Sequence, residues 1–120
     1  MSEKIMKNKR TYKMYFDDIL TAIARILEYT EGYDFTGFKR DYKTVDAVIR
    51  NFEIIGEAAK NISDEIKEQY PDVPWDGMYS LRNRISHAYF GIDYEIIWDI
   101  ITNHLPENKS QIEIISKEKH

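Results

Sequence analysis

The chain has 120 residues, of which 42% are hydrophobic and 32% are charged, and it contains no cysteine. These values are typical of one packed domain over residues 1–120, and they exclude a disordered chain, a disulfide framework, thiolate zinc sites and cysteine nucleophiles. The net charge of -4 argues against a surface that coats nucleic acid, because such binding depends on an excess of Lys and Arg.

The N-terminal segment is polar and basic. Met1–Arg10 are too polar for a secretory signal, and no apolar run approaches the roughly 20 residues that span a bilayer. We therefore expect a cytoplasmic protein without membrane contact. Residues 1–10 are expected to form a flexible tail, and we assign no function to the basic residues in and beside it: Lys4, Lys7, Lys9, Arg10 and Lys13.

Apolar residues at helical spacing predict two long helices in the first half of the chain. The first spans about Thr11–Glu31, and the second begins near Tyr42. Between them, Asp34 or Thr36 can cap a short helix that contains Phe38. The second long helix has a wide apolar stripe, which predicts a central position in the fold: Val45, Val48, Phe52, Ile55, Ala59 and Ile62.

The second half of the chain predicts shorter helices. A capped short helix follows a break at Asn61–Asp64, and another helix runs from position 75 or 76 to position 88 or 89, before a stop at Gly91. Asp93 is a natural N-cap for the next helix, and Pro106 either kinks that helix or starts a last one. Since no segment alternates like a strand, we predict an all-α bundle of four to five main helices.

The most informative stretch lies in the helix after position 75. There, Asn83 and Arg84 precede His87 by four and three positions, so they share its helix face. Arg82 precedes His87 by five positions, which places it about 140° around the axis and about 7.5 Å along it. His87 is off the core face, because that face is formed by a separate stripe: Met78, Leu81, Ile85 and Ala88.

Two interpretations of this polar face compete on residue types alone. One is a solvated helix surface, because charged faces usually only contact water. The other is a phosphodiester site with Arg82 and His87 as catalytic residues and with Asn83 and Arg84 as phosphate-binding support. In that site Arg stabilises charge on phosphorus, and His, with an ordinary pKa near 6.5, moves protons at neutral pH.

The motifs that the chain lacks narrow the chemistry. Its glycines are isolated, so it has no Gly-rich phosphate loop, and His87, His104 and His120 lack metal-binding spacing. We therefore expect no metal and no cofactor. RNA cleavage without a metal remains reasonable, because the 2′-hydroxyl is an internal nucleophile. A single His87 would have to serve both sides of phosphorus, which favours a homodimer with two copies of His87 and Arg82 in one cleft.

Longer blocks of the sequence resemble the HepT family of HEPN-domain toxins, the partners of minimal nucleotidyltransferase antitoxins. The similarity covers nearly the whole chain. It includes the spacing of Arg82, His87 and Tyr89, together with three blocks in the right order: Asp46–Ala59, Tyr70–Trp75 and Tyr89–Asp93.

This resemblance implies a homodimeric HEPN-type bundle that cleaves transfer RNA or messenger RNA as a metal-independent endoribonuclease, the toxin of a type VII-like toxin–antitoxin system. Arg82 and His87 match the catalytic pair, and Asn83 matches the polar residue that follows the motif Arg. Tyr89 matches the tyrosine that the nucleotidyltransferase antitoxin modifies with AMP. That AMPylation would place bulk and negative charge two residues from His87, which should repel an RNA phosphate.

Several alternatives stay open at this point. Tyr89 adjoins the apolar stripe and can instead be a core or dimer-interface aromatic, and Ser86 and Ala88 stand where relatives are expected to carry a more apolar residue and a glycine. The chain can also be a non-catalytic subunit that docks a minimal nucleotidyltransferase and binds nucleotide or RNA through Arg82 and His87. A third function is an inert structural helical dimer.

Overall fold

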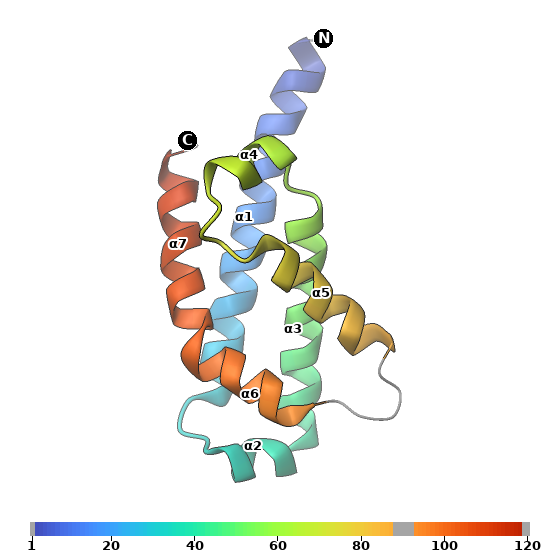
Figure 1. The fold of residues 1–120 in the computed structure, drawn as a ribbon, viewed down its shortest axis with the longest axis vertical. Helices are drawn as coiled ribbons and strands as arrows, with labels where there is room; N and C mark the ends of the chain where they lie inside the picture. The colour runs from blue at the N-terminus through green and yellow to red at the C-terminus, as the bar shows by residue number, and fades with distance from the viewer. Residues whose placement is uncertain (1, 88–92, 119–120) are drawn as a thin grey trace.

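The computed structural model describes residues 2–87 and 93–118 and, within these, the side chains of residues 12–81 and 93–118. The described residues form seven α-helices and no strand (Figure 1). The helices are α1 (Ser2–Thr30), α2 (Phe35–Arg40), α3 (Tyr42–Lys60), α4 (Asp64–Gln69), α5 (Trp75–His87), α6 (Tyr94–Asn103) and α7 (Leu105–Glu118). With α2 and α4 as short helices and the other five as main ones, the predicted all-α bundle is confirmed.

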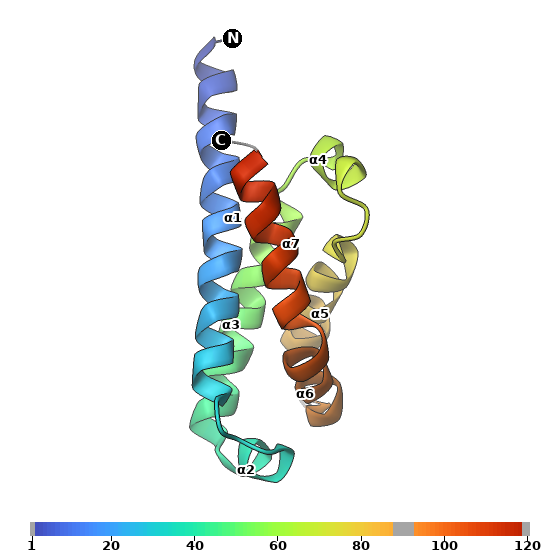
Figure 2. The same ribbon diagram turned by 90° about the vertical axis from the view of Figure 1, so that its left-hand side faces the viewer.

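The helix α3 occupies the centre of the bundle. It packs against α1 on one side and against α5 on the other, and α7 packs along α1. Figure 2 shows α1 at one side of the molecule and α5 and α6 at the opposite side. The central position predicted from the wide apolar stripe of α3 is therefore confirmed. Among the described residues, no helix is both long and apolar enough to cross a membrane.

The core forms where the apolar stripes of α1, α3 and α7 meet. Ile19 and Ile23 of α1, Val48 of α3 and Ile112 of α7 are all 0% exposed. Residues three or four positions apart lie on one face of a helix, so each stripe gives its helix one apolar side. Full burial of an aliphatic side chain of this size contributes about 1.5–3 kcal/mol. The bundle thereby holds α3 firmly, and α3 in turn supports α5.

Side chains cap the helices largely as predicted. Asp34 caps α2 by accepting a hydrogen bond from the N–H of Gly37 at 2.7 Å, whereas Thr36, the alternative cap, lies inside that helix. Ser63 caps α4, and Asp93 caps α6. Such a cap satisfies a backbone N–H that has no partner within the helix and contributes about 1 kcal/mol.

Asp41 caps α3, although no cap was predicted for this helix. Its carboxylate accepts hydrogen bonds from the N–H and the hydroxyl of Thr44, at 3.1 and 2.9 Å, and from the hydroxyl of Tyr33 at 2.6 Å. These bonds, that from Tyr33 foremost, hold the pKa of the Asp41 carboxyl below its ordinary value of 3.8. They also tie the turn after α1 to the start of α3.

Two further predictions concern helix ends. The prediction that the first helix begins near Thr11 was wrong, because α1 begins at Ser2. No Gly or Pro interrupts the sequence between these positions, so the helix can extend across them. The flexibility predicted for residues 1–10 stays a prediction. Pro106 is the second residue of α7, which confirms that it starts a new helix, since the first turn of a helix needs no N–H from proline.

Candidate functional site

The helix that carries the candidate residues, α5, starts from a buried anchor. The indole of Trp75 is only 5% exposed, and its Nε1 donates a hydrogen bond to the carbonyl oxygen of Tyr70 at 3.1 Å. The backbone N–H of Trp75 donates to the carbonyl oxygen of Val73 at 2.9 Å. The turn before α5 therefore holds the first residue of the helix from both its side chain and its backbone.

The apolar side of α5 packs on α3. Met78 is 8% exposed and belongs to the same core as Phe52 of α3, and the half-buried Leu81 packs against that core. The core stripe predicted for this helix is thus confirmed at Met78 and Leu81. Its other two members, Ile85 and Ala88, lie outside the described side chains.

Four of the predicted site residues lie in the last two turns of α5: Arg82, Asn83, Arg84 and His87. The prediction that one helix carries them is confirmed. Helix geometry places Asn83 and Arg84 on the same face as His87, and Arg82 about 140° around the axis. Their side chains lie outside the described part of the chain, so their roles stay predictions. Tyr89, the predicted modification site, lies outside the described residues altogether.

The C-terminal end of α5 lies at the edge of the molecule. Figure 1 shows α5 crossing α3 obliquely, with this end pointing away from α1 and α7. The next helix, α6, is anchored to the bundle through Trp98, whose ring centroid lies 5.1 Å from that of Phe38 and 6.5 Å from that of Phe35. Trp75, which is buried, therefore anchors the helix that carries the candidate residues, and Trp98, which is half-buried, anchors the next one. The stop predicted at Gly91 lies outside the described residues.

Two titratable groups in the described part of the chain have clearly shifted pKa values. They are Asp41, at the start of α3, and Tyr70, whose hydroxyl donates a hydrogen bond to Glu118. That bond to a carboxylate raises the pKa of Tyr70 above its ordinary value of 10.0. Within the described part of the chain, no cluster of His, Asp and Glu side chains has the arrangement of a metal site.

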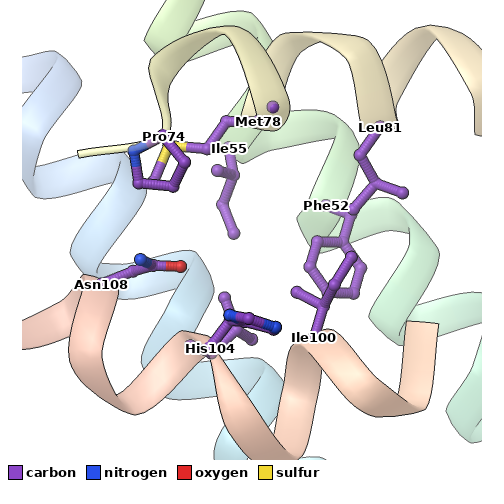
Figure 3. Close-up of a pocket in the computed structure, with 10 residues that line it drawn as sticks. Phe52, Ile55, Pro74, Met78, Leu81, Ile100, His104 and Asn108 are labelled. Atoms are coloured by element: carbon purple, nitrogen blue, oxygen red, sulfur yellow. The ribbon is translucent and has the colours of Figure 1, made fainter. Parts of the chain in front are cut away.

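A cavity of about 240 Å³ lies next to α5, between this helix, α3 and the junction of α6 and α7 (Figure 3). Two polar side chains, His104 and Asn108, lie on the side formed by the α6–α7 junction. The remaining wall is largely apolar and includes Phe52, Ile55, Met78, Leu81, Ile100 and Leu105. This cavity was not predicted from the sequence.

Asn108 carries a signal that could have indicated the cavity from the sequence. It lies three positions after Leu105 and four before Ile112, so it occupies the apolar stripe of α7, and it is 8% exposed. A buried amide at an apolar position is costly unless it is hydrogen-bonded, so such a residue indicates a specific polar environment. Asn51 of α3 follows the same pattern, since it is 5% exposed and its Oδ1 has no hydrogen-bond partner among the described residues.

Comparisons with known proteins agree with this helical architecture. Residues 19–115 match the family model described as "Ribonuclease HepT-like". The chain is 44% identical over 110 residues to "Putative RNase MJ0127" of Methanocaldococcus jannaschii, which covers 92% of this chain and 91% of that protein. It is 42% identical over 109 residues to "Probable ribonuclease HepT" of Thermococcus cleftensis, which covers 91% and 99% of the two chains. No solved structure matches the chain.

Proposed function

Because this chain belongs to the HepT-like family of ribonucleases, we propose that it is the ribonuclease toxin of a type VII-like toxin–antitoxin system. In this proposal it acts in the cytoplasm as a metal-independent endoribonuclease on transfer RNA or messenger RNA. Arg82 and His87 are the catalytic residues, and Asn83 and Arg84 help to bind phosphate. The names of the relatives support an activity on RNA, since those reported above are ribonucleases by name.

The observation that carries this proposal is the placement of four residues on one short stretch of helix. α5 holds Arg82, Asn83, Arg84 and His87 in its last two turns at the edge of the molecule, and its other end is anchored in the core by Trp75. A rigid helix can hold catalytic groups at a constant separation. The edge of the fold leaves room for a polymer such as RNA.

The residue types suit cleavage by the 2′-hydroxyl of the RNA itself. A base takes the proton of this hydroxyl, its oxygen forms a bond to phosphorus, and the bond from phosphorus to the 5′ oxygen breaks. An acid then gives a proton to the departing oxygen, and a 2′,3′-cyclic phosphate remains. His87 suits proton transfer near neutral pH, and Arg82 stabilises the negative charge that builds up on the phosphate oxygens.

The two proton transfers support a homodimer as the active form. They occur on opposite sides of phosphorus, so one imidazole in a fixed position is poorly placed for both. A two-fold axis near the end of α5 would bring a second His87 and a second Arg82 to the same cleft. One His87 would then act as base and the other as acid.

We further propose that a cognate minimal nucleotidyltransferase neutralises the toxin by AMPylation of Tyr89. The modification adds a phosphate with negative charge and a bulky nucleoside two positions after His87. Negative charge beside the site repels the RNA phosphate, and the added bulk fills the cleft.

The experiment that tests this function is incubation of the purified chain with total RNA in the presence of a chelator. Wild type and His87→Ala are compared at equal concentrations of folded protein, with His120→Ala as the matched histidine control. We expect wild type and His120→Ala to cleave RNA, and His87→Ala to leave it intact, because only His87 moves the protons of the reaction.

Two results would contradict the proposal. Cleavage by His87→Ala at the wild-type rate would remove His87 from the mechanism. Intact RNA with every variant, when the mass of the protein shows that Tyr89 is unmodified, would instead favour a non-catalytic subunit that binds nucleotide or RNA and docks a nucleotidyltransferase.

A further inference from the structure

The cavity beside α5 is large enough for a two-ring aromatic ligand. Its volume is about 240 Å³, whereas an engineered protein cavity of about 150 Å³ already accommodates benzene. Phe52 and Ile55 of α3 and Leu81 of α5 provide apolar walls for such a ligand (Figure 3). Apolar walls with a few polar groups are the usual composition of a small-molecule site.

A chain of hydrogen bonds sets which atom of Asn108 faces this cavity. The carbonyl oxygen of Asp72 can only accept, so it requires the Nε2 of Gln111, which donates to it at 3.2 Å. The Oε1 of Gln111 then accepts from the Nδ2 of Asn108 at 3.2 Å. The Oδ1 of Asn108 is therefore the atom that points into the cavity, as Figure 3 shows.

No group in the described part of the chain donates to this oxygen, and the atom is open to the cavity. Asn108 is 8% exposed, and the side-chain hydrogen bond of its amide is the one that it donates to Gln111. A ligand that brings an N–H group to this position would satisfy the acceptor. A ligand without the donor would lose this hydrogen bond and should bind more weakly.

We propose that this cavity binds a purine base, with the Oδ1 of Asn108 accepting a hydrogen bond from the N–H group of the base. A purine combines the two requirements of the cavity, since it is a flat two-ring system and it carries N–H donors at its edge. The imidazole of His104 lies on the same side of the cavity as Asn108, where it contacts the base edge.

The position of the cavity on α5 indicates where the purine comes from. Leu81 lines the cavity and directly precedes Arg82. Leu81 and His87 are about 9 Å apart along the helix axis, so one RNA strand can place a base in the cavity and a phosphate beside Arg82 and His87. Proteins that bind single-stranded RNA often hold unstacked bases in this manner. The assignment to RNA rests on the proposed function, and a free purine nucleoside is the other source of the same chemistry.

The test is an NMR titration of the nitrogen-15-labelled full chain with adenosine. We expect the backbone signals of Leu81 and Ile100 and the side-chain amide signals of Asn108 to shift, and ribose 5-phosphate to leave them unshifted. Purine riboside lacks the 6-amino group of adenosine. It is expected to bind about fivefold to tenfold more weakly, which is the loss that one hydrogen bond produces.

Matched variants separate the acceptor from the rest of the fold. Asn108→Leu replaces the amide with an apolar side chain of similar size, and it should weaken adenosine binding to the level of purine riboside. Asn61→Leu is the control, because the Nδ2 of Asn61 donates to the carbonyl oxygen of Glu57 at 2.8 Å in an exposed position outside the cavity. It should bind adenosine like wild type. The comparison of adenosine with purine riboside on the unaltered chain decides the question even if Asn108→Leu fails to fold.

A 2′-O-methyl RNA tetranucleotide that contains adenine distinguishes the two sources, because it has no internal nucleophile and cannot be cleaved. If the tetranucleotide binds more tightly than adenosine and Asn108→Leu abolishes this binding, the natural ligand is a base of RNA. If the tetranucleotide and adenosine bind with equal affinity, the natural ligand is a free nucleoside. Unshifted signals of Leu81, Ile100 and Asn108 with every purine would overturn the proposal. Side-chain amide signals of Asn108 that shift with protein concentration but do not respond to any purine would also overturn it, because a second copy of the chain would then fill the cavity.

The two proposals fail in distinguishable ways. RNA cleavage by a chain that binds no purine in this cavity overturns the purine site and leaves the proposed function intact. Purine binding by a chain that cleaves no RNA overturns the proposed function and leaves the purine site intact.

Discussion

The indole Nε1 of Trp75 lies 3.1 Å from the carbonyl oxygen of Tyr70, and this hydrogen bond joins the first residue of α5 to the end of α4. Tyr70 is itself tied to α7, because its hydroxyl donates to Glu118. The helix that carries Arg82 and His87 is thus connected through one turn to the last helix of the bundle. Changes in this turn are expected to reach the candidate residues through the position of α5.

Trp75→Phe is expected to lower the free energy of unfolding by about 1–2 kcal/mol. The substitution removes the N–H donor of a side chain that is 5% exposed and leaves the ring position apolar, and a buried hydrogen bond contributes about 1 kcal/mol net. Urea unfolding measures the effect as a lower midpoint with an unchanged slope. An unchanged midpoint would mean that the bond between Trp75 and Tyr70 does not stabilise the start of α5.

Tyr33→Phe is expected to raise the pKa of the Asp41 carboxyl toward 3.8, because the hydrogen bond from Tyr33 is the largest cause of its lowered value. A carboxyl whose pKa is lowered in the folded state stabilises the fold at pH values above the pKa that it has in the unfolded chain. This contribution is lost as the pH falls through the pKa of the folded state. NMR titration of the Asp41 carboxyl carbon measures this pKa in folded wild type and in folded Tyr33→Phe. Tyr29→Phe, a substitution of another partly exposed tyrosine, should leave the midpoint of the Asp41 titration unchanged. Equal midpoints in wild type and Tyr33→Phe would refute the assignment.

One chain has a mass of 14.3 kDa, and we expect it to sediment as a dimer of twice this mass. The rate of RNA cleavage per chain should fall when dilution dissociates the dimer. The reason is chemical, since two copies of His87 supply the base and the acid on opposite sides of phosphorus. Analytical ultracentrifugation and a dilution series of the cleavage assay measure the two properties together. A monomer that retains full activity would disprove the shared site.

Tyr89→Phe is expected to cleave RNA and to escape neutralisation. With ATP and the cognate nucleotidyltransferase, wild type should gain the mass of AMP and lose cleavage, because the added charge repels the RNA phosphate. The phenylalanine variant has no hydroxyl to modify and should remain active. Tyr79→Phe, in α5, is the matched control and should be modified like wild type. Modification of Tyr89→Phe would place the AMP on another residue.

Much of the fold could be predicted from local sequence patterns. Apolar spacing located α3 around Val48 and Phe52, and the caps Asp34 and Asp93 were identified because they bond to backbone N–H groups only three residues away. The start of α1 was missed, since residues 2–10 contain no residue that breaks a helix and their composition alone suggested a tail.

The cap of α3 was missed for a different reason. Asp41 depends on Tyr33, which lies eight positions earlier in the chain and comes close only through the turn and short helix between them. The residue pattern within one segment carries no information about a hydrogen bond between the end of one helix and the start of another.

Local patterns were enough to predict the main helices, their order and the placement of Arg82, Asn83, Arg84 and His87 on one helix, because these features depend on neighbours within a turn or two. The direction of the Asn108 oxygen and the cavity beside α5 became visible only in the packed fold. These depend on contacts between segments far apart in the chain, such as the hydrogen bond from Gln111 to Asp72. Packing between helices, rather than the pattern within any one of them, shapes that site.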